Sequence, residues 1–446
     1  MLELLDLRTR RERLEPRRLE IDPSVEQTVR EIVARVRHEG DAALFDLTLR
    51  FDGADLRERG LVVTPAEFEH AEETVPTELK AAIDALVERL EDLHRRQLPP
   101  EWVDERGGIR FGELVKPIRA AGCYVPGGRA VYPSSVAMTV VPAVVAGVEE
   151  VIVATPPSND GSVHAAVLYA AVRAGATRVV KVGGAQAVAA LAYGTDSVPA
   201  VDKVVGPGNL YVTEAKRQLS GVIGIDSLAG PSELVLIADA SADPAFLATD
   251  LVAQAEHDPQ ASAVFVTPDE DLLHATLKAL EAEIARAGRR EIVERALREH
   301  GQAVLVADLD HAAEVANDLA PEHLQIVTED PRAVAVKIRS AGAIFLGDWT
   351  PVPFGDYGVA SNHVLPTSGT ARFTSGLRAA DFVTVSSVVE MSQAAAAALA
   401  PEVDEIARAE GLVGHARAAT IRAERAAEPA PGRSAADRAS TPGSAP

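Results

Sequence analysis

The segment DLVAQAEHD places an amide and an imidazole where both could bind one cation. A helix over residues 244–257 would bring Asp250, Gln254 and His257 to one face, because they stand at positions i, i+4 and i+7. Gln254 and His257 would then offer an oxygen and a nitrogen donor. A polar helix end, whose C-terminal histidine complements the helix dipole, would show the same pattern. The spacing alone leaves both interpretations open.

The segment APEHLQIV carries two adjacent proton carriers, Glu322 and His323. They stand where a predicted helix ends and a short strand begins, a boundary typical of α/β active sites. A carboxyl group and an imidazole differ in intrinsic pKa, so the pair suits acid–base chemistry. A surface turn is the alternative interpretation.

Two further segments contain candidate donors. The stretch PFGDYGVASNHVLPTSG holds Asp356, Asn362 and His363 in a long loop, and such loops inside compact domains are usually functional or disordered. The apolar VLP that follows favours order. Glu410 and His415 in EGLVGHARA stand five residues apart, which is not one helix face. By themselves they indicate only exposed polar side chains.

Three glycine-rich loops, YVPGGRAVYPSS, KVGGAQAVAA and VVGPGNLYV, stand at predicted strand-to-helix junctions. None matches G-x-G-x-x-G, so the dinucleotide fingerprint is absent. Backbone N–H groups at such junctions can still bind phosphates, which supports a phosphate-bearing ligand only weakly.

The elements that must position these residues alternate along the chain. Residues 24–97 have helical periodicity, and residues 115–235 alternate short β-rich runs with helical runs. A second alternating set begins at residue 233, and we expect the N-terminal helices to complete it. A loop-rich stretch over residues 347–376 precedes an alanine-rich helical tail at 387–427. The pattern predicts an α/β fold of parallel sheets with helices on both faces.

Composition excludes several classes of protein. The 446 residues, 47% hydrophobic and 25% charged, are enough for two large domains. A net charge of -22 argues against nucleic-acid and membrane partners, and we find no signal peptide or membrane span. We therefore expect a cytoplasmic protein. The single cysteine, Cys123, is interpreted as a buried inert thiol, so any metal must have nitrogen and oxygen ligands.

Taken together, these segments resemble the histidinol dehydrogenase family. The blocks stand in the family's order over residues 21–422, and GPGNLYVTEAKR, LAPEHL and NHVLPT are specific to it. One departure is Ala360, where a glycine is expected before NHVLPT. The resemblance implies two Rossmann-like parallel-sheet domains, aldehyde-dehydrogenase-like, with small helical N- and C-terminal extensions.

The resemblance also implies domain bounds. Residues 1–23 would form an N-terminal extension, residues 24–114 and 233–380 a discontinuous first α/β domain with the zinc and catalytic residues, and residues 115–232 a second α/β domain on the NAD side. Residues 381–427 would form a helical tail for dimerisation and residues 428–446 a disordered tail.

Site residues follow from the resemblance, position by position. Gln254, His257 and Asp356 match zinc ligands within the chain, and His415 matches a ligand given by the partner subunit. Glu322 and His323 match the catalytic pair. The substrate contacts are Ser232, Gln254, His257, His323, Asp356, His363, Glu410 and His415, and the NAD contacts are Tyr124, Gln186 and Asn209.

The reaction implied is the zinc-dependent oxidation of L-histidinol to L-histidine, through enzyme-held L-histidinal, with two NAD, at the end of histidine biosynthesis. The enzyme would be a homodimer with shared active sites. The alternatives are a related zinc and NAD dehydrogenase of another small alcohol, a zinc hydrolase, and a non-catalytic ligand-binding protein. The last leaves the adjacent Glu322 and His323 unexplained.

Overall fold

The computed structural model describes residues 2–127, 131–359 and 361–428. Ala360 and residues 429–446 of the expected disordered tail lie outside the described residues. The chain divides into two compact units. The first contains the residues up to Leu98 together with Pro117–Val383, and the second contains Pro99–Lys116 together with the residues from Thr384 on. No helix within the described stretches is both long and apolar enough to cross a membrane.

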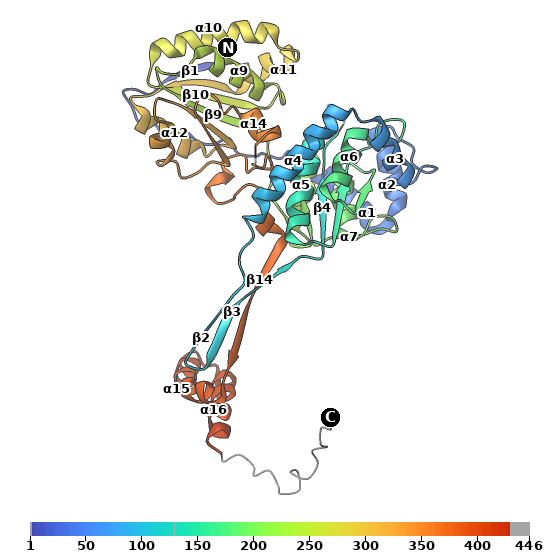
Figure 1. Cartoon of the computed structure of the whole chain (residues 1–446), viewed down its shortest axis with the longest axis vertical. Coiled ribbons are helices and arrows are strands. Elements are labelled where there is room, and N and C mark those ends of the chain that lie inside the picture. Colours follow the sequence, from blue (N-terminus) through green and yellow to red (C-terminus); the bar gives the residue numbers. More distant parts are fainter. Residues whose placement is uncertain (1, 128–130, 360, 429–446) are drawn as a thin grey trace, which may run out of the picture. The chain divides into compact units, whose positions relative to one another are not determined.

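The first unit contains a five-stranded parallel sheet (Figure 1) with the strand order β6-β5-β4-β7-β8. Its strands are β4 (Ala120–Tyr124), β5 (Glu150–Ala154), β6 (Arg178–Val180), β7 (Lys203–Val205) and β8 (Gly224–Ile225). The connecting helices are α5 (Pro133–Ala146), α6 (Ala165–Ala174), α7 (Gly184–Tyr193) and α8 (Leu210–Leu219). This is the Rossmann order, in which the chain changes direction across the sheet between β4 and β7.

The N-terminal helices cover this sheet. They are α1 (Pro23–Glu39), α2 (Asp41–Asp52), α3 (Pro65–Thr74) and α4 (Thr77–Arg95). Helix α1 packs on α7 and α8, and α4 packs on α5. The structure therefore differs from the expectation that these helices complete the other α/β unit. The reason is that α5 and α7 are apolar and buried almost all round, and such helices need a further layer over them.

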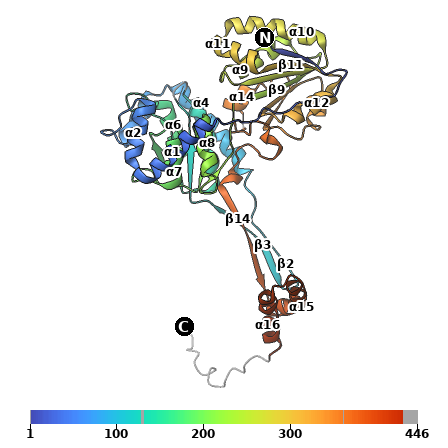
Figure 2. The same cartoon turned by 180° about the vertical axis from the view of Figure 1, so that it is seen from behind.

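A six-stranded parallel sheet, in the order β1-β11-β10-β9-β12-β13, is the second sheet of the first unit. Its strands are β1 (Glu3–Asp6), β9 (Glu233–Ala238), β10 (Ser262–Thr267), β11 (Gly301–Leu305), β12 (His323–Val327) and β13 (Ala343–Leu346). Side chains of α9 (Pro244–Ala255), α10 (Glu270–Arg286) and α11 (Arg290–His300) pack with one face, and those of α12 (Leu309–Leu319) and α13 (Pro331–Ala335) with the other. Figure 2 shows α9, α10 and α11 on one side of this sheet and α12 on the other. Helix α14 (Val352–Tyr357) contacts α9.

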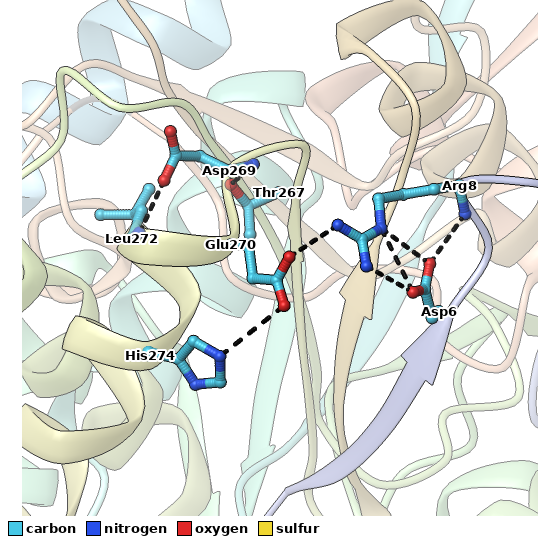
Figure 3. Close-up of polar contacts among 7 residues, drawn as sticks. All are labelled: Asp6, Arg8, Thr267, Asp269, Glu270, Leu272 and His274. Carbon is cyan, nitrogen blue, oxygen red and sulfur yellow. Dashed lines mark hydrogen bonds and ion pairs between the residues drawn. The ribbon is translucent and has the colours of Figure 1, made fainter.

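Strand β1 is an integral edge strand of this sheet, whereas residues 1–23 were expected to form an extension with helical character. The guanidinium of Arg8 donates to both carboxylate oxygens of Asp6 and, through Nη1, to Glu270 Oε2 at 2.7 Å (Figure 3). This contact joins the end of β1 to the first turn of α10. A four-residue strand is too short to show a period in the sequence. It forms because residues 3–6 pair in parallel with β11.

The second unit is built on a three-stranded sheet in the order β14-β3-β2. Its elements are β2 (Trp102–Arg106), β3 (Ile109–Pro117), β14 (Val383–Met391), α15 (Gln393–Ala409) and α16 (Val413–Ala427). Strands β2 and β3 form a hairpin closed by Gly107 and Gly108, both at positive φ as a two-residue turn requires. The sequence instead predicts an α/β domain that includes residues 24–114 and a helical dimerisation tail over residues 381–427. The Gly-Gly pair flanked by alternating residues was the overlooked signal.

The edge strand yields a stability test. Leu7 is 1% exposed and packs in the core beneath the six-stranded sheet, whereas Leu4 is 53% exposed. We expect Leu7→Ala to lower the free energy of unfolding by about 2–5 kcal/mol through lost burial and cavity formation. Leu4→Ala is the matched control and should change it by less than about 0.5 kcal/mol. Urea unfolding measures both, and equal values would show that the N-terminal strand does not contribute to the core.

Candidate active site

The expected catalytic pair lies at the amino edge of the six-stranded sheet. Strands β9 and β12 are neighbours, and His323 is paired with Leu234, one residue after Glu233. Helix α9 follows β9 and runs back across the sheet, so its C-terminal end returns to the same edge. Parallel topology therefore brings Gln254 and His257, at and just beyond the end of α9, to the side where β12 begins.

The imidazole of His323 is oriented by backbone. Its Nδ1 lies 3.2 Å from the carbonyl oxygen of Glu233, which can only accept, so Nδ1 carries the proton. Its Nε2 is buried and has no hydrogen-bond partner among the described residues. Burial, and then the charge of His257, lower the pKa of His323 to about 3. At neutral pH the ring is uncharged, and Nε2 offers a free lone pair.

The carboxyl group of Glu322 is held by the backbone of Glu233, the first residue of β9. Its Oε2 accepts the backbone N–H of Glu233 at 2.9 Å and lies 3.5 Å from His323 Nδ1. Burial, together with the charges of Glu233 and Asp356, raises the pKa of Glu322 well above its usual value, although a hydrogen bond from Ser232 opposes the rise. A carboxylate with a raised pKa is a stronger base than an exposed one, which suits proton transfer.

The donors of the α9 segment are free for a ligand. Gln254 is buried, and neither its Oε1 nor its Nε2 has a partner among the described residues. His257 Nδ1 lies 3.1 Å from the carbonyl oxygens of Ala253 and Gln254, which leaves Nε2 available. The histidine thus caps the helix end and still presents a ligand atom. Asp250 instead accepts a hydrogen bond from Gln325 at 2.7 Å.

Asp356 and His363 interact electrostatically with the same group of side chains. Asp356 is buried on α14, and burial raises its pKa to about 6 while His257 acts to lower it. Burial lowers the pKa of His363 to about 4, and a hydrogen bond to the backbone of Asp356 opposes this. The Nε2 atom of His363 lies 3.1 Å from Ser135 Oγ. These couplings place Asp356, His257 and His363 within electrostatic reach of one another.

The donor set fits a cation that accepts nitrogen and oxygen ligands. Within the described ranges, no three His, Cys, Asp or Glu side chains converge as a metal cluster. Of the three zinc ligands expected from the first unit, only His257 and Asp356 are His, Cys, Asp or Glu residues. The third is Gln254, whose amide has no partner among the described residues. Glu410 and His415 are exposed residues of the second unit.

Glu233 is the residue that the sequence reasoning missed. Its N–H and C=O hold Glu322 and His323, and its buried side chain accepts the N–H of Ser368 at 3.1 Å. Ser368 has a φ of 57°, which is strained for a residue other than glycine, so the carboxylate fixes a turn beside the site. Burial raises the pKa of Glu233 to about 7. The sequence shows only an acidic residue that opens the apolar run ELVLIA, which does not indicate this role.

The three expected NAD contacts line one pocket of about 750 Å³. Tyr124 ends β4, Gln186 lies in the first turn of α7, and Asn209 caps α8 by accepting the N–H groups of Tyr211 and Val212. All three follow the carboxyl ends of strands on the five-stranded sheet, and β4 and β7 flank its topological switch point. Nucleotides bind at such positions in Rossmann folds.

A buried ion pair supports the loop that carries Asn209. Lys216 Nζ lies 2.6 Å from both Asp226 Oδ1 and the carbonyl oxygen of Gly206. Asp226 Oδ2 accepts the N–H of Gly206 at 2.7 Å. Gly206 has a φ of +111°, and a Cβ there would lie 2.1 Å from the carbonyl oxygen of Tyr124. Only glycine lets this loop approach β4 so closely.

Known proteins share this sequence and this fold. A family model described as histidinol dehydrogenase matches residues 15–423. The histidinol dehydrogenase of Halalkalibacterium halodurans is 47% identical over 90% of this chain and 94% of its own length, and that of Synechococcus sp. is 48% identical over 89% and 92%. The crystal structure of histidinol dehydrogenase from Elizabethkingia anophelis has a TM-score of 0.88 at 33% identity, and the match covers 92% of this chain and 94% of that chain.

The chain is therefore an α/β oxidoreductase with parallel sheets, and the expected fold class is confirmed. Its similarity to these relatives extends over nearly the whole chain and includes the blocks around Glu322 and Asn209. It belongs to the histidinol dehydrogenase family.

The loop anchor can be tested by a double-mutant cycle. We expect Asp226→Ala to lower the free energy of unfolding by about 3–5 kcal/mol, because it leaves the ammonium of Lys216 buried without a counter-charge. Replacing both residues, as Lys216→Met with Asp226→Leu, should cost less than the sum of the single changes. Urea unfolding measures each variant. Asp55→Ala, which removes an exposed pair with Arg57, is the control. A loss no larger than the control's would contradict this role.

Proposed function

We propose that the enzyme oxidises L-histidinol to L-histidine in two NAD-dependent steps, with L-histidinal held between them. The observation that carries the proposal is the unpartnered, buried Nε2 of neutral His323, with Glu322 beside it. Membership of the histidinol dehydrogenase family supports the substrate. We infer that the enzyme serves histidine biosynthesis in the cytoplasm.

Residue roles follow from the geometry. NAD would supply the hydride acceptor, from the pocket lined by Tyr124, Gln186 and Asn209. In the first step His323 Nε2 accepts the hydroxyl proton while hydride leaves the carbinol carbon. Water then adds to the aldehyde, Glu322 accepts a proton from that water, and His323 accepts the remaining hydroxyl proton as the second hydride leaves. The first step releases one hydride and one proton, and the second releases one hydride and two protons. Histidinol, water and two NAD⁺ therefore give histidine as its carboxylate, two NADH and three protons.

A zinc ion fits the donors described above, with Gln254, His257 and Asp356 as ligands from one chain and His415 of the partner subunit as the fourth. Such an ion would hold the substrate's imidazole and amino group in position. Ser232, His363 and Glu410 would contact the substrate. Keeping the aldehyde enclosed matters because a free amino-aldehyde reacts elsewhere.

The decisive experiment counts NADH formed per L-histidinol consumed, and two is expected. One NADH would indicate an ordinary alcohol dehydrogenase, and none would indicate a hydrolase or a binding protein; either result contradicts the proposal.

Role assignments for the pair are tested with separate half-reactions. Glu322→Gln removes the base that activates water, so we expect oxidation of histidinal to fall by roughly 10²–10⁴-fold and oxidation of histidinol to fall much less. His323→Asn should impair both half-reactions. Presenting each substrate to each variant separates the steps, with circular dichroism and zinc content as controls. Equal losses in both half-reactions of Glu322→Gln would refute the division of roles.

A homodimer with shared sites is supported by the second unit's surface. That unit exposes many large apolar side chains: Trp102, Val103, Leu114, Val385, Val389, Val403, Ile406, Leu412, Val413 and Ile421. The buried side chains of its two helices are alanines alone, so a partner surface is needed to cover the exposed ones. Two isologous subunits would form two composite sites, each with Glu410 and His415 from the other chain.

Subunit mixing tests this arrangement. His257→Ala and His415→Ala should each be inactive alone. A mixed dimer would have one site with both lesions and one with neither, so about half of the wild-type activity per mixed dimer should return. Zinc content should recover in parallel. If His415 served its own chain, every site would keep one lesion, and mixing would restore nothing.

A further inference from the structure

The carboxyl group of Asp52 is the least explained side chain in the cofactor pocket. Asp52 is the last residue of α2, and Gly53 ends that helix in the left-handed conformation. Its Oδ2 atom is buried and has no hydrogen-bond partner among the residues described. Asp52 lines the same pocket as Tyr124, Gln186 and Asn209. No role was assigned to it by sequence reasoning.

Three features show that this carboxylate is unfavourable where it lies. A negative charge at the C-terminal end of a helix opposes the helix dipole. Burial raises the pKa of Asp52 to about 6, and no hydrogen bond offsets that rise. The charge also contributes to raising the pKa of the neighbouring Tyr124 hydroxyl. A group that costs stability and faces a cavity is commonly kept for a ligand.

The surroundings indicate what kind of ligand group would satisfy it. The N-terminus of α7 borders the pocket, and its Ncap residue, Gly183, provides no side-chain cap. The N–H of Gly184 donates to the Tyr124 hydroxyl at 3.1 Å, and the N–H groups that follow it in the first turn could bind a phosphate. An ideal Cβ at Gly183 would lie 2.6 Å from Pro156 Cβ, so no side chain can block that approach. A ligand with phosphates there and a hydrogen-bond donor at Asp52 is a nucleotide. Carboxylates bind nucleotides through ribose hydroxyls in related folds.

We propose that Asp52 accepts a hydrogen bond from a ribose hydroxyl of the nicotinamide cofactor and is a further cofactor-binding residue. This rests on the proposed use of NAD. The carboxylate supplies the acceptor that backbone N–H groups, being donors, cannot supply. At the adenosine ribose the carboxylate would also repel a 2′-phosphate, and so would favour NADH over its 2′-phosphorylated counterpart.

NADH binding to the full-length dimer, followed by nucleotide fluorescence without substrate, tests the proposal. We expect Asp52→Asn to weaken NADH binding by about tenfold or more, the usual loss of a hydrogen bond to a charged group. Its urea midpoint should be no lower than that of the wild type, because an unfavourable buried charge is removed. Asp55→Asn, an exposed carboxylate three residues later, is the matched control and should bind NADH normally.

Analogues identify the group recognised. For the wild type, an NADH analogue that lacks the relevant ribose hydroxyl should bind more weakly than NADH. For Asp52→Asn, the analogue and NADH should bind equally well. Weakened AMP binding by the variant would place the contact at the adenosine ribose, and weakened nicotinamide mononucleotide binding at the other ribose. The proposal would be overturned if Asp52→Asn and the wild type bound equally well only the NADH analogue that lacks the adenine amino group. Unchanged NADH affinity in Asp52→Asn would also overturn it. Failure of the wild type to bind NADH would instead refute the cofactor assignment itself.

Discussion

Both peptide groups of Glu233 are committed to the catalytic pair, and the site depends on that constraint. The N–H group binds Glu322 and the C=O group binds His323, so one residue at the start of β9 sets the positions of a carboxyl group and an imidazole at the start of β12. These contacts exist because the two strands are parallel neighbours that begin at the same edge. The pair is consequently as rigid as the sheet, which suits a base whose free nitrogen must meet a small substrate.

The two sheets use opposite edges for their functional residues. On the five-stranded sheet, Tyr124 and Asn209 follow strand ends at the switch between β4 and β7, as nucleotide sites do. On the six-stranded sheet, His323 stands at a strand beginning, and the return of α9 brings Gln254 and His257 to that edge. Rossmann order alone would have placed the second site at the other edge. The chemistry-bearing residues are instead those that end helices and open strands.

Both of these places contain buried polar atoms that have no partner among the described residues. His323 Nε2 and both amide atoms of Gln254 lack partners at one site, and Asp52 Oδ2 lacks one in the cofactor pocket. Near the catalytic pair, Ala320 and Ser368 have positive φ, an uncommon conformation for residues with a Cβ. A protein core normally satisfies its polar atoms, so such departures mark positions where ligands complete the structure.

The sequence by itself determined the alternation of strands and helices, the identity of the candidate donors and the family. Those follow from local periodicity and from ordered blocks such as LAPEHL, which need no tertiary contact to be recognised. It also indicated a helix after the GPGN loop, which is α8, and one buried cysteine, Cys123, as found.

Tertiary structure alone decided which sheet the N-terminal helices cover, that residues 3–6 join a sheet, and that Glu233 holds the catalytic pair. Each depends on pairing between segments far apart in the chain, and a short strand or a single peptide group has no periodic signal. The same holds for Asp52, whose unpartnered oxygen is apparent only once α2 and α7 border one pocket. Side-chain type shows what a residue can do, whereas burial and the absence of a partner, set by packing, show what it needs from a ligand.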